Sequence, residues 1–352
     1  MTSAGGVAAF RNAALDLEVV GFRFAGDQID LGVGRTDGSA DDVAVARIND
    51  SDAHAAVAIK DGTNRLTVIP YFVRTNADLV RGVSRTETTV GLGQVEATRS
   101  PNHGGVVVAI KNSQNSLSVI NYGVTLTGTE QLTVDRRGSD ATGGDIKDVD
   151  IATVVQGRGL TQTSGAFKGV VTAEIASDDS VWLRSWSIST DGQTLTDADS
   201  EQARSLNNEQ NFVATDVDVA VTGVLDGREL IVLSIATAAG LRVQTWAIST
   251  TGQLTRVDQH DAGTVVDIDS ARAAGQDAVV AVRLQNDGLS LISFHVTPQG
   301  QLRRSGTRDA GGISALAVDG RSSQDDLMVF SRGLTSGDLS LLYHDTHYSL
   351  LH

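Results

Sequence analysis

One short pattern recurs along the 352-residue chain: an apolar residue, alternating positions, and an aromatic residue five places after the first. Its clearest copies are LRVQTWAI from Leu241 and LSLISFHV from Leu289. The other copies begin at Leu17, Leu66, Leu117, Val181 and Leu339, and they carry Phe22, Tyr71, Tyr122, Trp186 and His344 at the aromatic position. Successive copies are 49, 51, 64, 60, 48 and 50 residues apart. A period near 50 with alternating strands is typical of radial β-repeat architectures.

Each copy has further strand-like runs on both sides. An apolar run precedes it, as in GVVVAIKN (105–112), and a turn with another strand follows, as in GQLTRVDQHDAG (252–263). A fourth strand comes next, as in VVDIDSARAA (265–274). Four such strands form one propeller blade. We therefore expect an all-β fold, a β-propeller with four-stranded antiparallel blades, as a single domain over residues 1–352. A β-sandwich would not explain the regular spacing, and a β-helix has a shorter period.

The number of blades depends on the chain ends. The first 36 residues supply three strands (7–12, 17–24 and 28–36), and the last 40 supply three more (313–320, 326–333 and 339–346). Seven aromatic copies favour seven blades. Six blades, with the closing blade assembled from both ends, stay open as the alternative. The two termini should lie close together in either case, because ring closure hides exposed sheet edges.

The repeat also resembles a known class of proteins. Residues 241–263 and 289–311 carry the motif L-x-L-I-x-W-x-V, then G-x-L-x-R, then D-x-G, and in this they resemble bacterial β-propeller repeat proteins. The resemblance covers most of the chain and implies the propeller fold. Propellers host hydrolases, lyases, lectins and scaffolds alike, so the resemblance implies no particular activity.

Charge and composition exclude several classes of partner. The formal net charge is −15, whereas binding of nucleic-acid phosphates needs clustered Lys and Arg. DNA, RNA and anionic membrane surfaces are therefore not expected as partners. No apolar run approaches the roughly 20 residues of a membrane helix, so no membrane insertion is expected. The chain has no cysteine, which excludes disulfides, thiolate nucleophiles and cysteine metal sites.

Acidic residues recur where the predicted inner strands begin. They are Asp42, Glu96, Asp150, Asp218 and Asp269. A second acid precedes three of them by two positions, and residues i and i+2 share one face of a strand. Crowded carboxylates around a central channel repel one another, and a hard divalent cation such as Ca²⁺ would relieve that repulsion. The alternative is that these side chains accept backbone N–H bonds or face solvent.

A second recurrence lies in the links from outer to inner strands. Arginines stand there at Arg35, Arg85, Arg137 and Arg308, with Asp309 beside the last. Arginine forks bind carboxylates, sulfates and phosphates, so these residues predict a site for a small anionic or sugar-like ligand. Alternatively, the acids make turns and the arginines pair with the neighbouring blade.

Three further features bear on a site. His260, beside Asp261 in one of these links, is the best catalytic candidate. Trp182 could stack on a sugar ring or pack against the next blade. The segments 157–168 and 205–212 are insertions relative to the repeat, and either could form a lid or one wall of a pocket.

Three functions remain open on this sequence. The first is a ligand-binding propeller without catalysis that recognises a glycan or a protein. The second is a hydrolase or lyase acting on an anionic substrate at the channel mouth, with possible Ca²⁺ assistance. The third is an assembly module. The missing first inner strand favours an upstream leader, hence a secreted or periplasmic protein if Met1 is not native. A native Met1 would favour the cytoplasm.

Overall fold

The computed structural model describes residues 5–25, 28–48, 54–154, 167–204, 213–225, 228–273, 277–297, 299–320, 326–333 and 339–345. Every helix or strand within those ranges is a β-strand, and the all-β prediction is confirmed. None of these residues belongs to a helix that is long and apolar enough to cross a membrane.

The chain separates into two compact units. The first comprises residues 1–153, 168–170 and 187–196, and the second comprises 154–167, 171–186 and 197–352. The boundary runs through β14 (Ile146–Val154), β15 (Gly169–Ala176), β16 (Val181–Ile188) and β17 (Leu195–Ala203). One domain over residues 1–352 stays a prediction.

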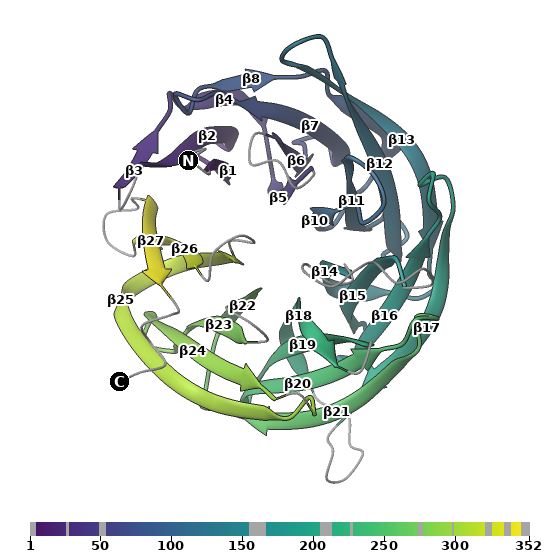
Figure 1. The fold of residues 1–352 in the computed structure, drawn as a ribbon, viewed down its shortest axis with the longest axis vertical. Coiled ribbons are helices and arrows are strands. Elements are labelled where there is room, and N and C mark those ends of the chain that lie inside the picture. The colour runs from purple at the N-terminus through teal and green to yellow at the C-terminus, as the bar shows by residue number, and fades with distance from the viewer. Residues whose placement is uncertain are drawn as a thin grey trace. The chain divides into compact units, whose positions relative to one another are not determined.

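The first unit contains three antiparallel sheets in chain order (Figure 1). The first sheet comprises β1 (Gly5–Arg11), β2 (Asp16–Ala25), β3 (Gln28–Leu31) and β4 (Arg35–Ser39). The second comprises β5 (Asp42–Arg47), β6 (His54–Lys60), β7 (Arg65–Val73), β8 (Leu79–Arg81) and β9 (Arg85–Val90). The third comprises β10 (Val95–Arg99), β11 (Gly105–Lys111), β12 (Leu117–Thr127) and β13 (Gln131–Ala141). In the first two sheets the outermost strand is interrupted, so that β3 and β4 both pair with β2, and β8 and β9 both pair with β7.

In the second and third sheets, a short Asx turn joins the second strand to the third. Asp61 Oδ1 accepts the backbone N–H groups of Thr63 and Arg65, and Asn112 Oδ1 accepts those of the residues two and four places later. The residue three places after the acceptor is left-handed, with φ of 58° at Asn64. Asn tolerates that conformation and Asx side chains cap their own turn, so the sequence encodes these hairpins locally.

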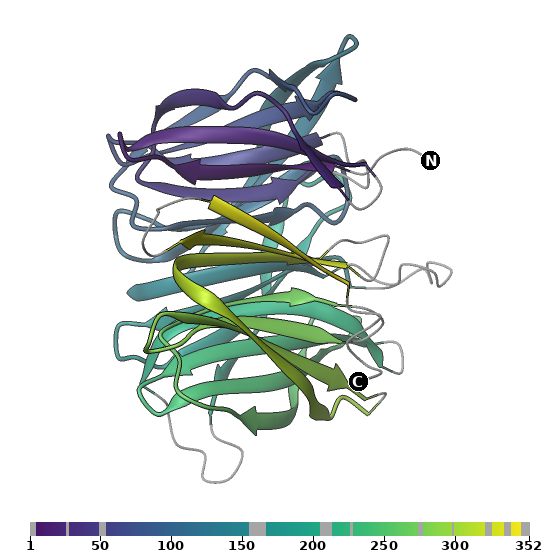
Figure 2. The ribbon, with the colours of Figure 1, turned by 90° about the vertical axis from the view of Figure 1, so that its left-hand side faces the viewer.

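The sheet of β14, β15, β16 and β17 is divided between the two units, and the second unit contains two further sheets. One comprises β18 (Ala214–Leu225), β19 (Arg228–Thr237), β20 (Gly240–Ile248) and β21 (Leu254–Asp261). The other comprises β22 (Asp267–Arg272), β23 (Ala278–Arg283), β24 (Gly288–Val296), β25 (Leu302–Gly320), β26 (Asp326–Gly333) and β27 (Leu339–Asp345). The 19-residue β25, which Figure 2 shows as a long curved strand, pairs first with β24 and then with β26. It joins two predicted blades into one sheet, and the blade number stays a prediction.

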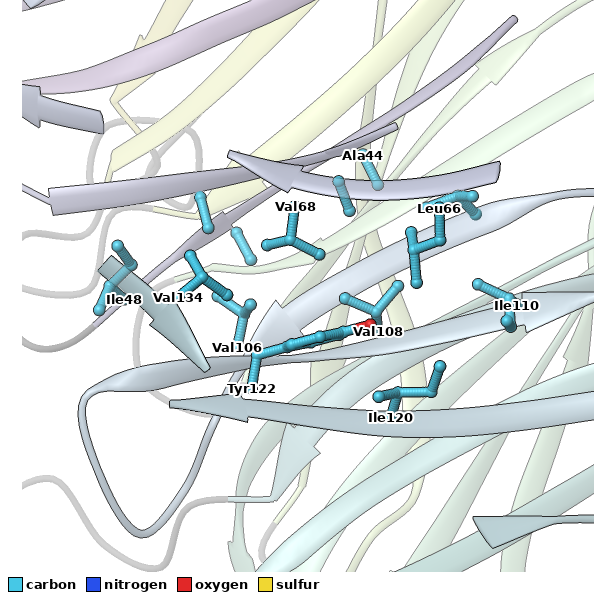
Figure 3. Close-up of a cluster of buried hydrophobic side chains, with 14 of the residues drawn as sticks. Ala44, Ile48, Leu66, Val68, Val106, Val108, Ile110, Ile120, Tyr122 and Val134 are labelled. Carbon is cyan, nitrogen blue, oxygen red and sulfur yellow. The ribbon is translucent and has the colours of Figure 1, made fainter. Parts of the chain in front are cut away.

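The repeat encodes the core. The aromatic residues Phe22, Tyr71, Tyr122, Trp186, Trp246 and Phe294 are all at most 3% exposed. In the first unit, Leu66 and Val68 of β7 pack against Val106 and Tyr122 of β11 and β12 (Figure 3). The second strand of the third sheet, β11, is buried on both faces, since six consecutive residues from Gly105 to Ile110 are buried. Each buried aliphatic side chain contributes about 1.5–3 kcal/mol.

Candidate functional site

A buried glutamate joins the second and third sheets of the first unit. Glu87 of β9 receives hydrogen bonds from Arg85 Nε (3.0 Å) and from the Tyr122 hydroxyl (3.2 Å) at Oε1. Arg136 of β13 donates to its other oxygen, Oε2, across 3.0 Å. We call this set, Glu87 with Arg85, Tyr122 and Arg136, the Glu87 clasp. It joins neighbouring sheets through three donors on one carboxylate.

The arginines keep the Glu87 carboxylate ionised. Burial opposes ionisation, since the side chain is only 10% exposed. The hydrogen bond from Arg85 and the charges of Arg136 and Arg85 outweigh burial, so the pKa of Glu87 lies below its ordinary value. Burial and the nearby carboxylate raise the pKa of the Tyr122 hydroxyl, which therefore stays protonated as a donor.

A cleft of about 530 Å³ opens beside the Glu87 clasp, between the second and third sheets. Its polar lining residues are Glu87, Asn112, Ser113, Gln114, Ser118, Arg136, Ser139 and Asp140. Its apolar lining residues are Leu66, Leu92, Ile110, Ile120 and Ala141. Arg136 also donates to Ser139 Oγ (2.7 Å), and Asn112 Nδ2 donates to Ser118 Oγ (2.8 Å), so hydrogen bonds hold these polar side chains in place. The cleft is thus lined by ordered polar side chains together with aliphatic ones.

An equivalent set of contacts joins the first and second sheets. Asp37 of β4 is bound by Arg35 Nε (3.0 Å), by Arg81 Nε (3.3 Å) and by the Tyr71 hydroxyl. Arg81 donates to Ser84 three residues later, as Arg136 does to Ser139. We call this set the Asp37 clasp. Its repetition shows that the clasp is part of how these sheets are joined.

The strand register shows which residues lie opposite the arginines predicted from the links. Arg35 lies opposite Val19, Arg85 opposite Val68 and Arg308 opposite Leu291, each three residues before the repeat aromatic of the paired strand. Arg35 and Arg85 pair with the acids Asp37 and Glu87, while Arg308 has partners of its own. Arg137 differs, because it is the extra residue of a bulge: Asn121 lies opposite Gly138 and Tyr122 opposite Arg136, which leaves no residue opposite Arg137. Its guanidinium donates to the carbonyl of Asp191 (3.1 Å). Of the predicted arginines, Arg85 bonds a residue of the cleft lining, Glu87.

His260 and Asp261 are not brought together as an acid–base pair. They are consecutive residues of β21, so their side chains project from opposite faces of the sheet. His260 contacts the edge of Phe294 with ring centroids 5.5 Å apart. Both oxygens of Asp261 accept from Arg242 (2.5 and 2.9 Å), and that arginine keeps the pKa of Asp261 below its ordinary value.

Asp309 and Trp182 both have partners within the second unit. Asp309 accepts from Ser290 Oγ at 2.7 Å. The half-buried Trp182 donates to Ser180 Oγ (3.1 Å), and the guanidinium of Arg184 lies over its ring, 5.7 Å from the centroid. Arg184 in turn donates to Glu174 (2.6 Å). One face of the Trp182 ring is therefore occupied by an arginine of the same strand, and sugar stacking at Trp182 stays a prediction.

Two of the predicted metal-binding acids make direct bonds to neighbouring strands. Asp42 accepts the N–H of Val43 at Oδ1 (3.0 Å) and that of Val95 at Oδ2 (2.9 Å), and Asp218 accepts from the Ser270 hydroxyl. Glu96, Asp150 and Asp269 also interact with other groups of the protein. Within the ranges that the structure describes, no three His, Asp or Glu side chains are placed to hold one metal ion. Calcium stays a prediction.

Arg136 is the cleft residue that sequence reasoning missed. The register places an arginine directly opposite the repeat aromatic in four sheets. The pairs are Tyr71 with Arg81, Tyr122 with Arg136, Trp246 with Arg256, and Phe294 with Arg304. In three of them the arginine follows the aromatic by ten residues, but Arg136 follows Tyr122 by fourteen, so alignment of the repeats on the aromatic would have found the other three and not Arg136. Both predicted insertions, 157–168 and 205–212, lie wholly or mostly outside the described residues.

Comparison with known proteins shows the fold. No protein-family model matches the chain, and no curated protein does. Among solved structures, it is similar to the BP39L lectin from Burkholderia pseudomallei (TM-score 0.60, 10% identity), over 98% of this chain and 97% of the lectin. A protein from Lactobacillus plantarum matches with TM-score 0.55 and 14% identity over 98% and 96% of the two chains. The WD40 domain of SCAP from fission yeast matches with TM-score 0.50 and 8% identity over 96% and 83%. The chain is an all-β protein of the β-propeller class.

Proposed function

We propose that this protein binds a glycan without catalysis and that the cleft beside the Glu87 clasp is its binding site. The observation that carries the proposal is that the ion pair of Arg136 and Glu87 lines the same cleft as the aliphatic side chains of Ile110 and Ile120. Sugar hydroxyls accept from a guanidinium and donate to a carboxylate, and the C–H face of a pyranose packs on aliphatic side chains. The BP39L neighbour, which is a lectin by name, supports this use of the fold.

The charge of the cleft points to a neutral sugar. Its charged lining residues are one cation, Arg136, and two carboxylates, Glu87 and Asp140. The Arg136 guanidinium is already paired with Glu87. A sugar carboxylate or sulfate entering the cleft would be repelled by Asp140. Arg136 would not offset that repulsion, because its charge is already paired with Glu87. We therefore expect uncharged hexoses or their oligomers to bind better than uronic or sulfated sugars.

The experiment is a screen of neutral and acidic glycans, followed by calorimetric titration of each glycan that binds. Arg136→Met should weaken binding about tenfold or more, because a charge-assisted hydrogen bond is worth roughly 1.5–3 kcal/mol. Arg81→Met is the matched control: Arg81 occupies the same place in the Asp37 clasp and bonds Ser84 in the same way, so the structural cost should be similar.

Binding lost in both variants alike would indicate a general effect of the clasps and not a site at Arg136. Unchanged binding in Arg136→Met would place the site elsewhere. A screen in which no glycan binds, or only acidic glycans do, would overturn the proposal.

A further inference from the structure

A second polar cluster lies away from the cleft, where the turn 189–192 meets the third sheet of the first unit. Asn102 Nδ2 donates to the carbonyls of Ile188 (2.6 Å) and Ser189 (3.2 Å). Gly192 has φ +73°, and a Cβ there would lie 2.2 Å from His103 Nε2. Only glycine therefore fits this close approach of the turn to the histidine.

The protonation state of His103 follows from its partners. The Asn121 amide nitrogen donates to the carbonyl of Gly192 (2.8 Å) and to His103 Nε2 (3.2 Å). A carbonyl oxygen can only accept, so the amide must present its nitrogen to both groups, and Nε2 must carry no hydrogen. The ring proton then sits on Nδ1 and is donated to Ser100 Oγ across 2.7 Å. This is the neutral Nδ1–H tautomer.

We propose that His103, Asn121 and Gly192 form an acid-sensitive latch that releases the turn 189–192 when His103 is protonated. A proton on Nε2 would point at the Asn121 NH₂ group, and donor would face donor. If the amide flips to accept from Nε2–H, its oxygen instead faces the Gly192 carbonyl, and the bond to the turn is lost. One amide cannot serve both an imidazolium and a carbonyl.

Neighbouring groups reinforce the neutral form. Burial lowers the pKa of His103 most, since Ser100 and Asn121 beside it are at most 3% exposed. The charge of Arg137 on β13 lowers it further, while a backbone hydrogen bond at His103 and the carboxylate of Asp191 on the turn raise it by less. The unfolded chain thus takes up the proton first, and the latch loses stability as the pH falls below about 6.5.

Two measurements test the latch. Long-range ¹H–¹⁵N NMR at pH 7.5 should show His103 as the Nδ1–H tautomer, assigned by the loss of its signals in His103→Gln. Amide exchange should show the protection factor of Gly192, whose N–H donates to the Ser189 carbonyl (2.8 Å), falling between pH 7 and pH 5. The fall should be roughly tenfold for each unit by which the folded pKa lies under 6.5.

In His103→Gln, the side-chain oxygen of the glutamine can accept a hydrogen bond from Asn121 at any pH. The protection factor of the Gly192 amide in this variant should therefore not change with pH. His295→Gln, in the second unit, is the control and should behave as the wild type does. The latch would be refuted by an Nε2–H tautomer in the wild type. Wild-type protection at Gly192 that is constant from pH 7 to pH 5 would refute it equally, even if His103→Gln failed to fold.

Discussion

The Tyr122 hydroxyl lies 3.2 Å from Glu87 Oε1, and this bond links a repeat aromatic to the outer strand of the preceding sheet. Tyr71 makes the same link to Asp37. At the corresponding places in the second unit stand Trp186, Trp246 and Phe294, none of which has a hydroxyl. The repeat therefore needs a large buried ring, while the hydroxyl belongs to the clasps of the first unit. The contribution of the buried ring to stability and that of the hydroxyl can therefore be measured separately.

Tyr122→Phe keeps the ring and removes the donor. We expect a loss of about 1–2 kcal/mol in the free energy of unfolding, because the buried Glu87 oxygen loses one of its partners. Tyr71→Phe should cost a similar amount, since Tyr71 donates to Asp37 in the same way. Urea unfolding of the two variants measures this. Two variants as stable as the wild type would show that the hydroxyl bonds contribute nothing net.

Glu87→Gln should change how stability depends on pH. The folded pKa of Glu87 lies below its ordinary value of 4.5, so the unfolded state binds the proton more tightly. The carboxylate therefore stabilises the protein above pH 4.5, and this contribution is lost as the pH falls through the folded pKa. We expect Glu87→Gln to be less stable than the wild type by about 1–3 kcal/mol at pH 7 and close to it near pH 3. Urea unfolding at both values is the measurement, and an equal deficit at both would contradict the assignment.

Gly252→Ala should destabilise the second unit strongly. Gly252 has φ +90°, and a Cβ there would lie 2.6 Å from the ring of Phe167 and 2.8 Å from the Cβ of Ala198. Both the backbone and the space oppose a side chain, and we expect a cost of about 1–3 kcal/mol from overpacking with strain added to it. Gly263→Ala is the control, because nothing lies within 4 Å of its added Cβ. Thermal unfolding should separate the two variants clearly.

Removal of divalent metal tests the predicted calcium site. Asp42 already uses both carboxylate oxygens on backbone N–H groups, and Asp218 bonds a serine. If these carboxylates serve only as hydrogen-bond acceptors, which is the alternative to a cation site, we expect Tm in EDTA to equal Tm in added Ca²⁺. A ligand of the folded state would raise Tm. A fall in EDTA that Ca²⁺ reverses would therefore support the predicted calcium site.

Several features of the fold could be predicted from sequence because they are encoded locally. Alternation with period two marks the strands, the aromatic every 50 residues or so marks one strand of each repeat, and Asx residues mark the turns. Asp61 and its turn illustrate this, because the hydrogen bonds at Asp61 Oδ1 reach no further than Arg65. The long β25 was not predicted, because Arg308 and Asp309 were expected in a link before a separate strand at 313–320, whereas the chain continues through them as one strand from Leu302 to Gly320.

The candidate site depended on tertiary structure. By itself, the sequence determined the strands, the turns and the buried aromatic positions, since each follows from neighbours a few residues apart. Arg136 and Arg137 are consecutive residues, and the pattern of link arginines predicts only Arg137 as a ligand-binding residue. A bulge between Asn121 and Tyr122 decides the matter: Arg136 lies opposite Tyr122 and bonds Glu87, while Arg137 bonds the carbonyl of Asp191. The physical reason is that successive strand residues face opposite sides, so a shift of one residue exchanges their surroundings. Such a shift is settled only when the sheets pair and pack.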